Sequence, residues 1–200
     1  MRRLAVALVA VAVVTALAPA AQADGPLVVR GTDPAGDAVS PRGDLREWAF
    51  FFDSVKSRWN VKANVLNGEN PVSAPSWHNT DTRIRVFWDT DELMAGAEFR
   101  TDIYAAGTTA PFALEATTVS VATGLPAAPG CTTNAATGTG ATVKYQLPGT
   151  YRVKVPETCL VDQASVRIRY QMIFDPPPAG GGSTDRAPNA GWSPRLSTPG

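Results

Sequence analysis

The sequence contains a single histidine, His78, and only two cysteines among its 200 residues. One histidine cannot build a multi-histidine zinc site, and two thiols cannot supply a four-thiolate zinc or iron–sulfur site. A Ser-His-Asp triad would have to use His78, yet the sequence has no Gly-x-Ser-x-Gly nucleophile elbow and no serine in a recognisable nucleophile context. We therefore expect His78 to be an exposed loop residue, and we assign no catalytic residue.

An excess of charge of one sign is also missing, because 18 Lys and Arg residues balance 18 Asp and Glu residues. This balance gives no electrostatic case for nucleic acid or for an anionic membrane surface as a partner. The composition, with 44% hydrophobic and 18% charged residues, is that of an ordinary globular protein. It excludes collagen-like, coiled-coil and wholly disordered chains.

Only one apolar run is long, and it spans residues 4–17. Two arginines precede this run, and the small residues Ala21 and Ala23 follow it. The three-part pattern is typical of a secretory signal peptide, and the run is shorter than the roughly twenty residues that cross a bilayer. We expect cleavage after Ala23 and a secreted mature protein that is a soluble monomer with no membrane span.

The two cysteines, Cys131 and Cys159, are predicted to form a disulfide, because a secreted protein folds in an oxidising compartment. Their spacing does not match the Cys-x-x-Cys pattern of a reactive thiol pair. Closing the intervening loop would stabilise the fold by about 3–4 kcal/mol.

Apolar and polar residues alternate with a period of two along most of the predicted mature chain. This period is typical of strands, and turn-forming residues separate the alternating segments. About eight or nine short strands without an internal repeat indicate an all-β fold, a single antiparallel β-sandwich of the jelly-roll type. The clearest strands are expected at residues 48–52, 59–65, 84–88, 98–104, 112–122, 142–147, 151–155 and 166–174.

The alternation ends in a Pro- and Gly-rich stretch after Phe174, which we interpret as a loop. The segment that follows contains Trp192, which we expect to pack back on the sandwich. We place the β-sandwich domain at residues 24–196 and expect residues 197–200 to form a frayed tail.

Three aspartates open the predicted domain within twelve residues, at Asp33, Asp37 and Asp44. Turn-forming residues such as Gly36 space them, and calcium takes six to eight oxygen ligands that loops supply readily. Asp185 is a candidate fourth ligand, because the C-terminal segment returns from the last clear strand. The alternative is that these aspartates cap turns through their side chains.

Aromatic and acidic residues offer two further kinds of site. Among the five tryptophans, Trp77 lies in an expected loop and is the best candidate for an exposed sugar-stacking ring, with packing on the rim of the sandwich as an equal alternative. Trp48, Trp59 and Trp88 fit core positions of strands. A glycosidase would need two carboxylates across a cleft, and nothing in the sequence singles out a pair. The available carboxylates are Asp53, Glu69, Asp81, Glu92, Glu98 and Asp102.

The opening Asp33-Pro-Ala-Gly-Asp37, a short Pro/Gly loop, Asp44-Leu45 and an aromatic-rich strand entering the 59–65 hairpin form a recognisable pattern. This pattern resembles the start of secreted bacterial β-sandwich domains of the carbohydrate-binding family 9-like and DOMON-like group, such as the C-terminal domain of glucodextranase-type enzymes. The resemblance implies a jelly-roll-like sandwich, a calcium site near Asp33, Asp37 and Asp44, and non-catalytic binding. Members of that group usually have a longer Gly/Tyr-rich stretch after Gly-Asp, whereas the corresponding loop of this sequence spans only residues 38–43.

The sequence therefore predicts a secreted, non-catalytic binding module for an extracellular glycan or a cell-envelope component. A structural or adhesive envelope protein that acts through protein contacts is the first alternative. A small secreted hydrolase is the second.

Overall fold

A computed structural model describes residues 28–38, 40–77, 82–91, 96–107, 111, 113–128, 131–132, 142–161, 163, 165–174 and 183–197. The predicted signal peptide and His78 lie outside these ranges. Within them the chain forms eleven strands and three short 3-10 turns, η1 (Pro41–Gly43), η2 (Pro75–Trp77) and η3 (Glu157–Cys159). None of the described segments is a helix with the length and hydropathy needed to span a membrane.

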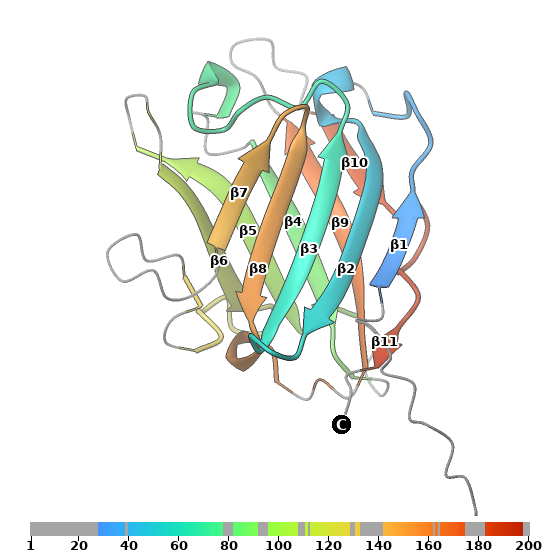
Figure 1. Ribbon diagram of the computed structural model, residues 1–200, viewed down its shortest axis with the longest axis vertical. Coiled ribbons are helices and arrows are strands. Elements are labelled where there is room, and N and C mark those ends of the chain that lie inside the picture. The colour runs from blue at the N-terminus through green and yellow to red at the C-terminus, as the bar shows by residue number, and fades with distance from the viewer. Residues whose placement is uncertain are drawn as a thin grey trace, which may run out of the picture.

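Two antiparallel sheets face each other (Figure 1). The five-stranded sheet has the order β1 (Val28–Thr32), β2 (Leu45–Asp53), β3 (Arg58–Val65), β8 (Thr150–Pro156) and β7 (Thr142–Gln146). The second sheet has the order β10 (Ser183–Ala187), β9 (Ser165–Phe174), β4 (Arg83–Asp89), β5 (Phe99–Ala106) and β6 (Ala113–Ser120), and β11 (Leu196–Ser197) also pairs with β9. The all-β sandwich predicted from the alternation is confirmed.

The alternating side chains build the core between the sheets. In β3 every second residue is buried, from Trp59 to Val65, and β9 shows the same period from Val166 to Phe174. The rings of Trp59 and Trp88 meet edge to face with centroids 6.1 Å apart, which joins β3 to β4 across the sandwich. Period-two burial therefore leaves the opposite residues of each strand on the outer faces.

The predicted disulfide is confirmed between Cys131 and Cys159, whose Cα atoms lie 5.5 Å apart. The N–H of Thr118 in β6 donates to the carbonyl of Cys131 over 2.8 Å, and Cys159 ends η3 directly after β8. Because β6 and β8 belong to different sheets, the disulfide is a covalent link across the sandwich.

The C-terminal segment contributes two more strands. Residues 183–187 form β10 on the edge of β9, and Ser197 in β11 pairs with Ser165 in β9. The rest of the expected frayed tail, residues 198–200, lies outside the described residues. The neighbouring Leu196 is only 4% exposed, so its burial anchors this end of the chain. Trp192 lies 5.2 Å from each of the guanidinium groups of Arg167 and Arg169, so it packs back on β9 as predicted.

Candidate metal centre

The connection from β1 to β2 places two of the predicted aspartates at one end of the sandwich. Asp33 follows β1 directly, and its N–H donates to the carbonyl of Arg46 over 3.0 Å. Asp44 precedes β2, and its Oδ2 accepts the N–H of Gly36 over 2.9 Å. Gly36 has a φ of +79°, a left-handed conformation that glycine adopts without steric cost, so the chain turns sharply between the two aspartates.

The last of the four predicted aspartates comes from the opposite sheet. Asp185 lies in β10, which runs beside β2 and η1 at the upper right of the sandwich (Figure 1). Its Oδ2 accepts the N–H of Leu45 over 2.6 Å, and its Oδ1 accepts the N–H of Arg186 over 2.7 Å. These bonds fix the carboxylate of Asp185 against the start of β2.

Three of the four predicted ligands converge. Asp33, Asp37 and Asp185 each contribute a carboxylate oxygen to a cluster in which all the oxygens lie within 4.8 Å of one another. Asp33 and Asp185 are buried, whereas Asp37 is exposed and accepts a hydrogen bond from the side-chain amide of Asn189. The cluster is therefore buried on two sides and open to solvent at Asp37.

Asp44 lies behind this cluster and adds a fourth negative charge to it. Its side chain is 1% exposed, and its charge raises the pKa of both Asp33 and Asp185. Within the described part of the chain, Asp44 Oδ1 and Asp33 Oδ2 are buried oxygens without a hydrogen-bond partner. Two unsatisfied carboxylate oxygens in one buried place are costly unless a cation compensates them.

The charges of the described basic residues do not neutralise the cluster. Arg42 pairs with Glu69 at 3.0 Å, and Arg46 comes no closer than 4.0 Å to Asp44. Burial, followed by the charges of Asp185, Asp37 and Asp44, raises the pKa of Asp33 from 3.8 to about 7. The negative charge of the cluster is therefore poorly compensated by the protein itself.

This donor set suits a hard divalent cation. Calcium–oxygen distances are about 2.3–2.6 Å, so two oxygens on one calcium ion lie at most about 5 Å apart. The 4.8 Å limit of the cluster meets this condition. The three carboxylates would supply part of the coordination, and backbone carbonyls and water commonly supply the rest.

A second acidic cluster, Asp89, Asp91 and Glu98, has a different electrostatic balance. Asp89 is fully buried, and it accepts hydrogen bonds from Arg167 Nε and Arg195 Nη2, each over 2.7 Å. Two guanidinium groups thus neutralise the most buried carboxylate of this cluster. We interpret it as an ion-pair network that joins β4, β9 and the C-terminal segment.

The prediction of Trp77 as an exposed sugar-stacking ring is wrong. Trp77 is 0% exposed, and its ring packs against Tyr151 with centroids 5.4 Å apart. The burial follows from η2, which folds the loop before β4 back over the core. Trp48, Trp59 and Trp88 are buried, as their strand patterns predict.

The carboxylates considered for a catalytic pair are largely engaged elsewhere. Asp102 bonds to Arg85 at 2.7 Å and to Arg100 at 2.9 Å, and Glu69 pairs with Arg42. Asp81 and Glu92 lie outside the described residues.

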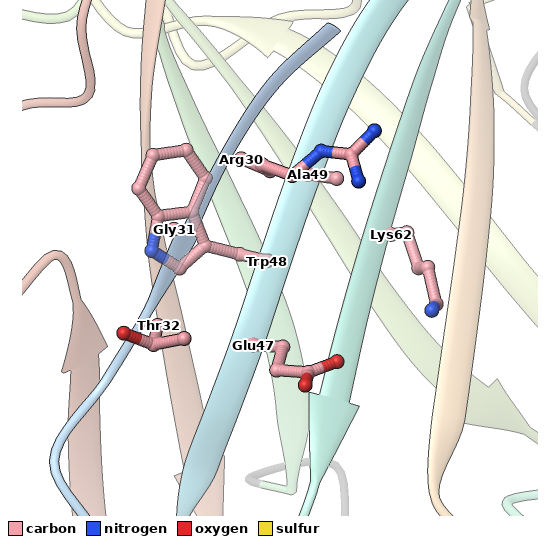
Figure 2. Close-up of a pocket in the computed structure, with 7 residues that line it drawn as sticks. All are labelled: Arg30, Gly31, Thr32, Glu47, Trp48, Ala49 and Lys62. Atoms are coloured by element: carbon pink, nitrogen blue, oxygen red, sulfur yellow. The ribbon is translucent and has the colours of Figure 1, made fainter.

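The structure also contains an open hollow that the sequence analysis missed. It has a volume of about 360 Å³ and lies over β1, β2 and β3 on the outer side of the five-stranded sheet (Figure 2). No sequence motif marks it, because strand pairing alone brings its residues together. The lining residues are Arg30, Gly31, Thr32, Glu47, Trp48, Ala49 and Lys62.

Comparison with protein-family models, with curated proteins and with solved structures finds no match to this chain. The resemblance to the carbohydrate-binding family 9-like and DOMON-like group stays a prediction that depends on the residues quoted for it.

Proposed function

We propose that the protein is a secreted, calcium-stabilised β-sandwich that binds an extracellular glycan or a cell-envelope component without catalysing a reaction. The observation that carries the proposal is the convergence of Asp33, Asp37 and Asp185 around buried, unpartnered carboxylate oxygens. An ion at this place would join the β1–β2 connection of one sheet to β10 of the other. Calcium would therefore act on stability and on the order of this end of the sandwich.

The support for calcium over magnesium comes from the irregular source of the ligands. Asp33 and Asp37 come from a turn, and Asp185 comes from a strand. Calcium accepts irregular coordination of this kind, whereas magnesium requires a nearly ideal octahedron and retains several of its waters.

The support for a binding module comes from the surfaces that remain open. The hollow on the five-stranded sheet offers an open, concave surface (Figure 2). By contrast, the exposed large apolar side chains favour an adhesive protein interface only weakly, because most of them lie singly in turns and loops. Among the described residues they are Val28, Val55, Leu66, Val121, Leu125, Leu147 and Val161.

Thermal unfolding of the metal-free mature protein tests the calcium site. Calcium at a hundred times its dissociation constant adds about 2.7 kcal/mol if it binds only the folded state. For a chain of this size we expect the melting temperature to rise by about 5–10 °C. Magnesium should give a smaller rise.

Two matched variants make this test specific. Asp37→Ala should abolish the calcium shift and remove little apolar packing, because Asp37 is exposed. Asp91→Ala, in the cluster that arginines neutralise, should keep the shift. Identical melting curves in millimolar calcium and in chelator would refute the site, and the aspartates would then be turn caps. A panel of neutral and acidic polysaccharides, tested in the same assay, addresses glycan binding separately.

A further inference from the structure

Basic side chains form a row across the outer face of the five-stranded sheet. The pairing of β3, β8 and β7 sets Lys62 opposite Arg152, and Arg152 opposite Lys144. On the other side, Ala49 of β2 lies opposite Lys62, and Arg30 of β1 lies opposite Ala49. One row across all five strands therefore carries four cations and a single small residue.

Lys154 adds a fifth cation in the next row, between Asn60 of β3 and Thr142 of β7. We call Arg30, Lys62, Lys144, Arg152 and Lys154 the basic face. Arg30, Lys144 and Arg152 are exposed, and the other two are half-buried. All five are thus positioned on the outside of the sandwich.

The described carboxylates form no ion pair with any residue of the basic face. Glu47 lines the hollow, but it accepts a hydrogen bond from the side-chain amide of Asn64 over 2.6 Å. Asp53, at the end of β2, accepts the N–H of Lys56 over 3.2 Å. Glu47 contributes one negative charge against five cations, so the net charge of the basic face stays positive.

The outer face of the other sheet is also basic, but several of its arginines have carboxylate partners, whereas Arg169 and Arg186 repel each other. There Arg85 and Arg100 share Asp102, and Arg167 pairs with Asp89. Like charges directly opposite each other on neighbouring strands destabilise a sheet. An unneutralised row on one sheet is therefore a cost to the fold, and an anionic ligand would offset it.

The shape of the basic face fits an extended ligand. Neighbouring strands lie about 4.8 Å apart, so the row from Arg30 to Lys144 is roughly 19 Å long. Ala49 leaves space between Arg30 and Lys62, and the hollow lies there (Figure 2). A linear polymer with regularly spaced negative charges would contact the whole row, whereas a small anion would contact only one part of it.

Polar groups line both sides of the row. On one side, pairing places Glu47, Asn64, Thr150 and Gln146 in one row, and on the other side it places Asn60 and Thr142 beside Lys154. Such groups hydrogen-bond to the hydroxyls of a sugar. The described tryptophans are buried or lie on the other sheet, and among the described residues Phe51, opposite Asn60, is the aromatic ring that the strand register places on this face. A single ring does not provide the succession of stacked rings on which single-stranded nucleic acids bind.

We infer that the basic face binds an acidic polysaccharide, a linear glycan that carries carboxylate, sulfate or phosphate groups. This inference rests on the proposed function, and it names the class of glycan and the surface that holds it.

Binding of fluorescent polygalacturonate and dextran sulfate to the full mature protein, measured by anisotropy, tests the inference. Both should bind, neutral dextran should not, and affinity should fall as salt rises because the contacts are exposed charges. The double variant Lys62→Gln and Arg152→Gln should weaken binding of both polymers by about tenfold or more. Its melting temperature should not fall, since the two cations face each other.

A matched control removes two positive charges elsewhere. Lys56 lies in the β2–β3 turn and Arg186 lies in β10, and both are exposed. The double variant Lys56→Gln and Arg186→Gln has the same net charge and should bind like the wild type. An equal loss in both variants would mean that net charge alone attracts the polymers, and it would overturn the inference.

The remaining outcomes separate this inference from the proposed function. If neutral glycans bind equally well to the wild type and to the Lys62/Arg152 variant, the proposed function holds. The inference that the glycan is acidic is then wrong. Tighter binding of oligothymidylate or of phosphatidylserine vesicles through the same residues would overturn the glycan assignment. If none of the glycans binds, both this inference and the glycan part of the proposed function are wrong. The effect of calcium on the melting temperature remains an independent test of the metal site.

Discussion

At the scale of single residues, Asp33 is the most informative side chain in the molecule. It is 7% exposed, and it faces the carboxylates of Asp37, Asp44 and Asp185. Arg46 approaches Asp44 at 4.0 Å, and no described guanidinium forms an ion pair with Asp33. When no cation is bound, burial and the repulsion from the neighbouring carboxylates raise the pKa of Asp33 to about 7.

The raised pKa predicts how stability depends on pH in the presence of chelator. Between pH 4 and pH 7 the folded state holds a proton that the unfolded state has released, so the free energy of unfolding falls as pH rises through this window. The variant Asp33→Asn removes this contribution, and at pH 8 in chelator it should be more stable than the wild type by at most about 4 kcal/mol, because each pKa unit corresponds to about 1.4 kcal/mol. Urea unfolding across this pH range measures the effect.

Two comparisons check the assignment to Asp33. Calcium should restore the stability of the wild type at pH 8 and should leave Asp33→Asn unchanged. Asp53→Asn, at the end of β2, should keep the pH dependence of the wild type. Parallel pH curves for the wild type and Asp33→Asn would contradict the assignment.

Gly31 is the second position where one residue decides local packing. A Cβ atom placed there would lie 2.4 Å from Cζ2 of Trp48, so the indole ring lies directly against the backbone of β1. Trp48 is 5% exposed and cannot move without disturbing Tyr170, whose ring centroid lies 6.4 Å away.

We expect Gly31→Ala to lower the free energy of unfolding by about 1–3 kcal/mol, because overpacking forces the indole ring out of its place. Chemical unfolding followed by tryptophan fluorescence measures this change. Thr32→Ala, one residue further along the same strand and exposed, should change stability by less than about 0.5 kcal/mol. Equal effects of the two variants would mean that the ring has room to relax.

At the scale of elements, the sandwich is tied together at two places. At one, the Leu45–Asp185 hydrogen bond joins β2 to β10, and calcium in the aspartate cluster would strengthen this connection. At the other, the disulfide joins the loop beside β6 to the end of β8. The two connections restrain different edges of the sheets, so their contributions to stability should be nearly additive.

The disulfide should stabilise the fold by about 3–4 kcal/mol in the loop-entropy description. The double variant Cys131→Ala and Cys159→Ala should therefore unfold at lower urea concentration. The calcium shift should be the same size in this variant as in the wild type. Unchanged unfolding of the wild type after full reduction would contradict the expected contribution of the disulfide.

At the scale of the whole molecule, charge is segregated although the total is zero. Negative charge collects at one end of the sandwich between the sheets, and positive charge spreads over the outer face of the five-stranded sheet. A cation and a polyanion would thus bind at separate places. The balanced net charge gave no electrostatic case for nucleic acid or an anionic membrane surface as a partner. That argument concerns the whole chain, and it does not describe the charge of one face of one sheet.

Local pattern in the sequence determined the sandwich, the disulfide and the buried positions of Trp48, Trp59 and Trp88, because period-two alternation and cysteine pairing are properties of short segments and of the compartment. It also marked Asp33, Asp37, Asp44 and Asp185 as a group. Tertiary structure alone decided that Asp44 stands behind the other three, since that depends on where β10 meets β2. It likewise decided the burial of Trp77 and the alignment of Lys62, Arg152 and Lys144. Strand register sets that alignment, and register brings together residues that lie up to ninety positions apart in the chain.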